Sequence, residues 1–144
     1  MKTILDGFSG TTRVSQALAK SGYQIISNDI SAWSFIFGRC YLLNTQPPKY
    51  YNELISHLNN IPGYSGWFTE NYGGVDNAGS SIQSTGLKKP WQIHNTQKLD
   101  AIRDEIDVLQ LNDIDKAVAL SSLILALDAV DNTLGHFTSY LKNW

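Results

Sequence analysis

The first thirty residues constrain the fold more than any other stretch, because they have the pattern of a strand, a glycine turn, a helix and a second strand. The short apolar run at residues 3–5 predicts a strand that is buried on both faces, and residues 6–10 then have turn chemistry. Apolar residues three and four apart predict a helix that is capped by Thr11 or Thr12 and ends near Lys20. Residues 23–27 predict the second strand. Such a unit is typical of an α/β protein.

The second strand ends in Asn28 and Asp29, so an acid follows the glycine turn by roughly twenty residues. In an open α/β sheet, ligands lie beyond the carboxyl ends of the strands, and an acid there accepts hydrogen bonds from ribose hydroxyls. Thr12 stands where a second loop glycine is expected, which favours a cofactor without phosphates. An ordinary turn between strand and helix also needs glycine, so a cofactor site and a structural turn both stay open.

Six stretches occur in an order that is more specific than the glycine turn alone: Asp6-Gly-Phe-Ser-Gly-Thr11, Gly22-Tyr-Gln-Ile-Ile-Ser-Asn-Asp29, Gly66-Trp-Phe-Thr-Glu-Asn-Tyr-Gly-Gly74, Lys89-Pro-Trp-Gln-Ile-His-Asn-Thr96, Lys98-Leu-Asp-Ala-Ile-Arg103 and Asn132-Thr-Leu-Gly-His136. Together they resemble the N-terminal, cofactor-binding part of the D12-class DNA adenine-specific (N6) methyltransferases. The resemblance covers nearly the whole chain.

The resemblance implies an α/β fold, namely a helix-rich, partial Rossmann-like methyltransferase fold in which the C-terminal part of the sheet is missing. It implies S-adenosylmethionine as cofactor and methyl transfer to adenine N6 in double-stranded DNA. The implied cofactor-binding residues are Asp6, Phe8, Ser9, Gly10, Thr11, Asn28 and Asp29.

Two departures from the family pattern limit what the chain does by itself. The family's catalytic Asp-Pro-Pro-Tyr motif does not occur in the 144 residues, where the only Pro-Pro pair is preceded by Gln46 and followed by Lys49. The family also has a segment upstream of the first strand, whereas Met1 lies at the edge of that strand. We therefore expect an incomplete methyltransferase domain that is inactive alone and has no catalytic residue of its own. A non-catalytic nucleoside-binding module and a helical interaction subunit are the alternatives.

The whole chain is expected to be one incomplete domain, with the βαβ unit at 1–30, helices at 31–60, an irregular insertion at 61–90 and a helical part at 95–144. Ser31 is expected to cap a buried helix over 32–43. On that helix Trp33 or Phe35 can stack on a cofactor adenine, and core packing is the alternative.

The irregular insertion contains aromatic and polar residues that can line a pocket for the cofactor or the target base, or can simply anchor the loop: Trp67, Phe68, Glu70, Asn71 and Tyr72. Lys88 and Lys89 form a basic pair that either meets a phosphate or is solvated.

Two longer helices are predicted in the C-terminal part. The first is capped by Asn95 or Thr96 and runs to about residue 110, with its acids, including Asp100, on the solvent side. The second, over 114–130, is capped by Asp113 and is apolar nearly all round. Acidic and polar residues then form either a hydrogen-bonded cluster or, less simply, a metal site: Asp128, Asp131, Asn132 and His136. Residues 138–144 can form a last helical segment that carries, with Phe137 just before it, Tyr140, Leu141 and Trp144.

The formal net charge of −2 gives no electrostatic signature of nucleic-acid binding, so most phosphate contacts are expected outside this chain. The single cysteine, Cys40, excludes a disulfide framework and makes a reducing cytoplasm the default. No signal peptide or membrane span is evident. Because two strands alone leave sheet edges unpaired, we expect self-association or a complementing C-terminal segment.

Overall fold

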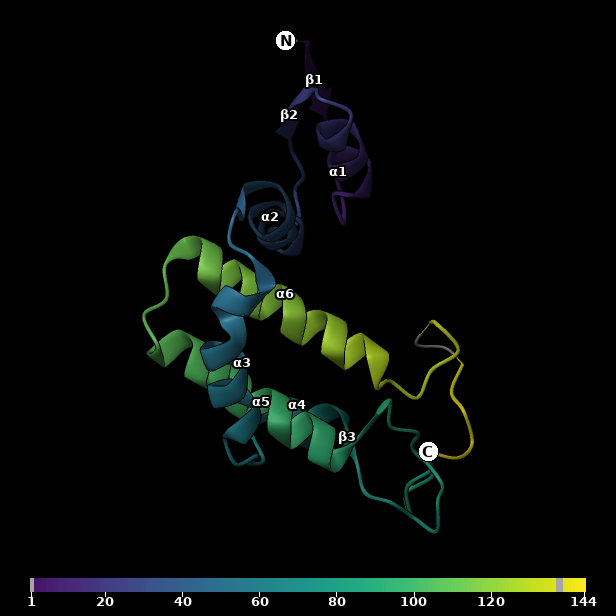
Figure 1. Cartoon of the computed structure of the whole chain (residues 1–144). Coiled ribbons are helices and arrows are strands. Elements are labelled where there is room, and N and C mark those ends of the chain that lie inside the picture. The colour runs from purple at the N-terminus through teal and green to yellow at the C-terminus, as the bar shows by residue number, and fades with distance from the viewer. Residues whose placement is uncertain (1, 137–138) are drawn as a thin grey trace. The chain divides into compact units, whose positions relative to one another are not determined.

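The computed structural model describes residues 2–136 and 139–144, and this part of the chain is α/β (Figure 1). In chain order the elements are β1 (Thr3–Asp6), α1 (Arg13–Lys20), β2 (Gln24–Ser27), α2 (Ala32–Gly38), the π-helical turn η1 (Arg39–Leu43), the 3-10 turn η2 (Pro48–Tyr51), α3 (Asn52–Asn60), α4 (Trp67–Tyr72), β3 (Gly73–Gly74), β4 (Trp91–Gln92), α5 (Ile93–Val108) and α6 (Asp113–Ala129).

The chain divides into two compact units and passes between them three times: after Tyr51, after Leu109 and, within α6, after Ser122. The first unit contains the residues up to Tyr51 together with Gln110–Ser122. The second unit contains Asn52–Leu109 and Leu123–Trp144.

The predicted βαβ unit is confirmed in the first unit. β1 and β2 pair in parallel, with Leu5 opposite Ile26 and Asp6 opposite Ser27. Helix α1 connects them, and its buried Ser15 donates a hydrogen bond from Oγ to Asp6 Oδ2 at 2.6 Å. The prediction that the first strand is buried on both faces is wrong, because Leu5 is 66% exposed and Ile26 54% exposed. No described segment covers the sheet face to which these two side chains belong.

The start of α1 differs from the prediction that a threonine side chain caps it. Thr12 occupies the N-cap position, but its side chain makes no capping hydrogen bond and its φ is 62°, in the left-handed region. Its hydroxyl instead accepts a hydrogen bond from Gln16 Nε2 at 3.0 Å. The backbone therefore enters the helix through a conformation that a glycine adopts more easily.

The helix predicted over 32–43 forms as α2 continued by the π-helical turn η1. Ser31 precedes it but makes no side-chain capping bond. The prediction that this helix is buried is wrong for most of its aromatic surface, since Phe37 is buried while Trp33 and Phe35 are exposed. The Phe37 ring lies edge-on to Trp33 of the same helix, with 5.5 Å between the ring centroids. It also stacks on Tyr41 of η1, with 5.8 Å between the centroids.

The second unit is built around α5, whose Ile102 and Ile106 are buried as their helical spacing predicts. Asp100 on the same helix is also buried, so its predicted place on the solvent side is wrong. Its carboxylate accepts hydrogen bonds from the backbone amides of Gly66, Phe68 and Thr69, at 2.9 to 3.1 Å. These bonds anchor the N-terminus of α4, a short helix inside the stretch expected to be irregular.

Both predicted caps of the long helices are displaced. α5 begins at Ile93, directly after β4, and Thr96 lies within it, donating from Oγ1 to the Ile93 carbonyl at 2.8 Å. α6 is capped by Asn112, whose Oδ1 accepts hydrogen bonds from the amides of Ile114 and Asp115, both at 3.0 Å. Asp113 is instead the first residue of the helix.

The chain after α6 is not helical over residues 130–136 and 139–144, contrary to the predicted last helical segment. The predictions for Phe137 and Thr138 concern positions outside the described residues. Single bridges join this part to the loop after β3, as in Ser80 to Asn143. Asn132 is buried here and donates from Nδ2 to the Leu141 carbonyl at 3.1 Å.

Across the described residues, none of the helices combines the length and apolar character that crossing a membrane requires.

Candidate functional site

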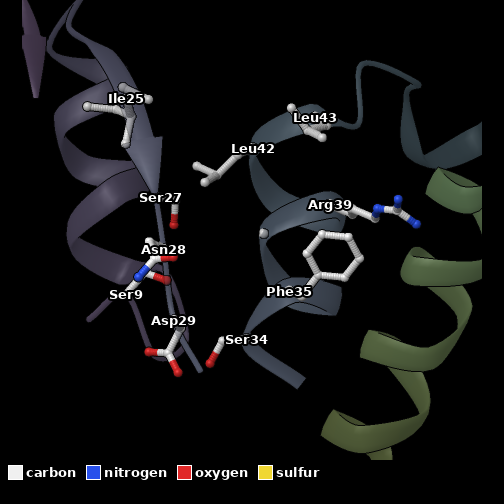
Figure 2. A pocket seen from close by; sticks show the side chains of 12 residues that line it. Ser9, Ile25, Ser27, Asn28, Asp29, Ser34, Phe35, Arg39, Leu42 and Leu43 are labelled. Carbon is white, nitrogen blue, oxygen red and sulfur yellow. The ribbon is translucent and has the colours of Figure 1, made fainter. Parts of the chain in front are cut away.

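A pocket of about 620 Å³ opens in the first unit where β2 ends (Figure 2). Residues at the carboxyl end of β2 form one side, and residues of α2 and η1 form the other. In Figure 2 the polar side chains of Asp29 and Ser34 occupy the lower end, and Ile25 and Leu43 the upper end. A ligand in this pocket would meet a polar end and an apolar end.

Asp29 is held in place by backbone amides on both of its oxygens. Oδ2 accepts a hydrogen bond from the Gly10 amide at 2.9 Å, and Oδ1 accepts one from the Ser31 amide at 2.9 Å. The Ser31 and Gly10 amides lower the pKa of this carboxyl below its usual value, because they stabilise the ionised form. An ionised carboxylate has about four lone-pair positions, so acceptor capacity remains on both oxygens.

Asn28 fastens the glycine turn to the end of β2. Its amide donates to the Asp6 carbonyl at 2.9 Å, and its carbonyl accepts from the Ser9 amide at 3.0 Å. Its Nδ2 also donates to the Gly7 carbonyl at 3.2 Å. These bonds place the turn against the strand end, as a loop that shapes a ligand site must be.

The turn requires left-handed backbone at Gly10, where φ is +49° and the amide points at Asp29. Thr12 repeats that conformation with a side chain present, at a cost of about 1 kcal/mol. The second loop glycine that the sequence lacks would therefore have fitted this backbone without strain.

The structure brings together only some of the residues that the sequence indicated. Ser9, Asn28 and Asp29 line the pocket, and Gly10 is bound to Asp29. The Asp6 carboxylate is engaged by Ser15 of α1 and is not part of the lining. Phe8 is 95% exposed and Thr11 is exposed, and neither lines the pocket. Their assignment to cofactor binding stays a prediction.

Of the two aromatic candidates on α2, Phe35 lines the pocket and Trp33 does not. The Phe35 ring is 61% exposed, and the Arg39 guanidinium lies 4.3 Å from its centroid. The same guanidinium forms an ion pair with Asp113, with 2.9 Å between Arg39 Nη2 and Asp113 Oδ2. Because Arg39 supports the ring, a flat aromatic group in the pocket has a fixed surface on which to stack.

Ser34 is a residue that the sequence reasoning missed. Ser34 lines the pocket beside Asp29 with a residue exposure of only 2%, and its hydroxyl oxygen is buried without a hydrogen-bond partner among the described residues. It lies near enough to add a weaker lowering of the Asp29 pKa, without the geometry of a formed hydrogen bond. Buried hydroxyls normally have partners, so a ligand group or water at this end would satisfy Ser34. Its position in the first turn of the helix after the acid was the available signal.

The donor set fits a nucleoside better than a phosphate. Arg39 is the one basic residue among the described residues that line the pocket, and it is paired with Asp113. A carboxylate accepts hydrogen bonds from ribose hydroxyls, and a phenyl ring with aliphatic neighbours accommodates a base. The site can therefore hold and orient a nucleoside, and it has no group placed to neutralise a phosphate chain.

The described residues contain no group of three or more His, Cys, Asp or Glu side chains that could hold a metal ion. The polar residues after α6 instead bond to one another or to the backbone. Asp131 Oδ2 accepts a hydrogen bond from Thr133 Oγ1 at 2.8 Å, and the backbone amide of Asn132 donates to the Pro90 carbonyl at 2.6 Å.

Comparison with known proteins gives a consistent picture. A family model described as D12 class N6 adenine-specific DNA methyltransferase matches residues 1–144. The modification methylase StsI of Streptococcus sanguinis is 27% identical over 99% of this chain and 22% of its own length. The type II methyltransferase M.NlaIII of Neisseria lactamica is 25% identical over 99% of this chain and 41% of its own length.

The modification methylase LlaI of Lactococcus lactis subsp. lactis is 27% identical over 99% of this chain and 24% of its own length. The chain thus spans between about a fifth and two fifths of the length of these relatives. No solved structure matches.

Proposed function

Because the chain belongs to the D12 class of N6 adenine-specific DNA methyltransferases, we propose that it forms the S-adenosylmethionine-binding part of an enzyme that methylates adenine N6 in double-stranded DNA. Its relatives of similar sequence are named modification methylases, which makes a restriction-modification system the expected context. Its parallel βαβ unit would then be one end of a partial Rossmann-like domain.

The observation that carries this proposal is the placement of Asp29. The carboxylate lies at the end of β2, is kept ionised by two backbone amides, and faces a pocket that contains an exposed aromatic ring. This is the position from which an acid in an α/β sheet binds the ribose of a nucleoside cofactor.

S-adenosylmethionine, when bound, supplies the methyl group. In the proposed arrangement Asp29 accepts hydrogen bonds from the ribose hydroxyls, Phe35 stacks on the adenine and Ser34 offers its unpaired hydroxyl at the same end. Binding in one orientation contributes to rate by positioning, since a correctly placed reactant avoids much of the entropic cost of an encounter. The target adenine must leave the duplex stack to reach a methyl donor held in this way.

Methyl transfer by the 144 residues alone is not expected, because they contain no Asp-Pro-Pro-Tyr motif to hold the target amino group. We propose that this chain contributes cofactor binding to a larger catalytic domain. Incorporation of labelled methyl groups into adenine-containing duplex by the pure 144-residue protein would contradict that division of roles.

Calorimetric titration with S-adenosylmethionine tests the binding site. Phe35→Ala should weaken binding about tenfold, which is about 1.4 kcal/mol. Trp33→Ala, which changes an aromatic residue two positions away on the same helix but outside the pocket lining, should bind like the unchanged protein. Asp29→Ala should weaken binding at least as much, because it removes the ribose acceptor.

Asp29→Ala also removes the tether to Gly10, so its thermal unfolding must be measured alongside. A folded Asp29→Ala protein with unchanged affinity would mean that the carboxylate only supports the turn. No binding heat from any of these proteins would mean that the βαβ unit serves as scaffold.

A further inference from the structure

A second pocket, of about 610 Å³, lies in the second unit and is walled by aromatic rings. Trp67 and Tyr72 of α4 have ring centroids 5.9 Å apart, and Phe68 lies 5.2 Å from Trp91. Tyr140, from the chain after α6, also lines it. We call this hollow the aromatic pocket.

The rings of the aromatic pocket have a rigid support. Asp100 holds the backbone of the first turn of α4, from which Trp67 and Phe68 project. Gly73 of β3 follows α4 directly, and a Cβ at this position would lie 2.6 Å from Thr96 Oγ1 of α5. Strand β3 and helix α5 therefore approach each other too closely for any side chain at Gly73. Trp91 is fixed by its indole N–H, which donates to the Leu127 carbonyl at 2.9 Å.

Of the two indole rings that line the aromatic pocket, Trp91 is buried, whereas Trp67 is 68% exposed to solvent. Two lysines stand at the rim of the pocket. Lys89 donates from Nζ to the Asn71 carbonyl at 2.6 Å, whereas Lys88 is exposed and forms no ion pair among the described residues. The side-chain nitrogen of Asn71, Nδ2, donates a hydrogen bond to the Trp67 carbonyl at 2.7 Å. The side-chain oxygen of Asn71 therefore points away from that carbonyl and is available as an acceptor.

We propose that the aromatic pocket binds an unstacked DNA base, with Trp67 as the stacking surface and Lys88 as the contact to an adjacent phosphate. Every base has a π-face, and stacking on an aromatic side chain contributes about 1–3 kcal/mol per base. The choice of DNA as the ligand rests on the function proposed above, whereas the location and the residues come from the geometry of the second unit. The exposed indole of Trp67 offers a surface on which one base can stack, and the Lys88 ammonium at the same rim can bind the phosphate next to that base.

The charge balance of the chain shapes the expected binding. The formal net charge is −2, so binding at this pocket should depend on stacking more than on counterion release. With Lys88 as the single phosphate contact, the dependence of the logarithm of affinity on the logarithm of salt concentration should have a slope of only about −0.7 to −0.9.

Fluorescence anisotropy with two labelled duplexes tests the proposal. One duplex has a single bulged adenine, and the other has an abasic nucleotide at the same place, so that they differ only in the base. The unchanged protein should bind the bulged adenine about tenfold more tightly. Trp67→Ala should abolish this preference, and Trp67→Phe, which keeps a π-face, should retain most of it.

Lys88→Ala should weaken binding of both duplexes equally and remove most of the salt dependence, because it removes a phosphate contact and no base contact. Trp33→Ala serves as the control, since that exposed indole belongs to the first unit. Equal affinity for the two duplexes, no binding of either, or binding that Trp67→Ala leaves unchanged would each overturn the proposal. So would Trp67-dependent binding of a proline-rich peptide without binding of DNA.

The outcome is separable from that of the cofactor experiment. Loss of base preference with S-adenosylmethionine binding intact would overturn the aromatic pocket alone. Base preference without cofactor binding would overturn only the role proposed for the first unit.

Discussion

Asp29 and Asp100 have the same electrostatic task in the two units. Each is an ionised carboxylate that accepts hydrogen bonds from backbone amides in a turn or at the start of a helix, where no carbonyl partner is present. Asp29 lines an open pocket, so part of its acceptor capacity faces outward. Asp100 is only 8% exposed and also accepts from Thr69 Oγ1 at 2.6 Å, so its capacity is used within the protein. The first carboxylate is available to a ligand and the second is structural.

Asp100→Asn should lower the free energy of unfolding by about 2–4 kcal/mol, because a buried amide nitrogen would face amide donors that then lack an acceptor. Asp107→Asn is the matched control, being the same substitution on the same helix. Asp107 is exposed and pairs with Arg103 one turn away, and such pairs contribute about 0.5 kcal/mol. Urea unfolding measures both, and equal losses would contradict a structural role specific to Asp100.

Asp100 also makes stability depend on pH in a direction that its environment fixes. Burial raises its pKa, but the hydrogen bonds from Thr69, Phe68 and Gly66 outweigh that effect, so the folded pKa lies below the usual value. The stabilisation is therefore complete above the unfolded pKa of about 4, and it is lost as the pH falls through the lower folded pKa. Unfolding midpoints of the unchanged protein should drop more steeply below about pH 4 than those of Asp100→Asn. Parallel curves would contradict this.

At the scale of elements, α6 begins with a reciprocal cap. Asn112 accepts from the amides of Ile114 and Asp115, and its Nδ2 donates to Asp115 Oδ2 at 2.7 Å. Asp115 in turn accepts hydrogen bonds from the Tyr50 and Tyr51 hydroxyls, at 3.2 and 3.1 Å. The cap thus joins α6 to the 3-10 turn η2 within the first unit.

Asn112→Ala should lower the free energy of unfolding by about 1 kcal/mol, since the two helix amides lose their acceptor. Asn112→Ser retains a capping oxygen and should restore most of that loss. Thermal unfolding of the three proteins measures the difference. An equal loss in the serine and alanine variants would show that the contact to Asp115, which serine cannot make, is the larger contribution.

Elements with regular spacing could be predicted from the sequence, and contacts made across long separations could not. The βαβ unit and α5 follow from apolar periodicity, α2 and α6 follow from mostly apolar segments preceded by capping residues, and the structure contains all of them. The start of α6 was misplaced by one residue because Asn112 and Asp113 are adjacent and both are good caps. Asp100 was predicted to be solvent-exposed because helical spacing puts it on the polar face of the helix. Its hydrogen-bond partners, at residues 66–69, lie more than thirty residues away in the sequence, so spacing within the helix could not reveal them.

The candidate site divides in the same way. Asn28 and Asp29 were predictable because they follow the second strand, at the edge where ligands of an α/β sheet lie. Ser9 was expected only from the family resemblance, and all three residues line the pocket. Phe35 could not be chosen over Trp33, since the choice depends on how α2 rotates above that edge. Ser34 became visible only when its hydroxyl proved buried without a partner. The roles of all these residues in cofactor binding stay predictions until binding is measured.

For the molecule as a whole, the small sheet of the first unit has an apolar face that is exposed among the described residues. Leu5 and Ile26 are paired neighbours on one face, and both are more than half exposed. Each strand also has one unpaired edge, because the sheet contains β1 and β2 alone among the described residues. An apolar face with open edges is a surface on which further strands pair, either from a complementing segment or from a second copy.

We therefore predict that the 144-residue chain self-associates in isolation through this sheet. Ile26→Lys should shift the protein toward monomer, because a charge on the bare face opposes burial there. Val108→Lys is the control, since it adds the same charge at an exposed position of α5 in the second unit, and it should associate like the unchanged protein. Light scattering over a series of micromolar concentrations distinguishes the three. An unchanged protein that is monomeric throughout would mean that two strands and one helix tolerate exposure of this face, and that no partner is needed to keep the cofactor unit soluble.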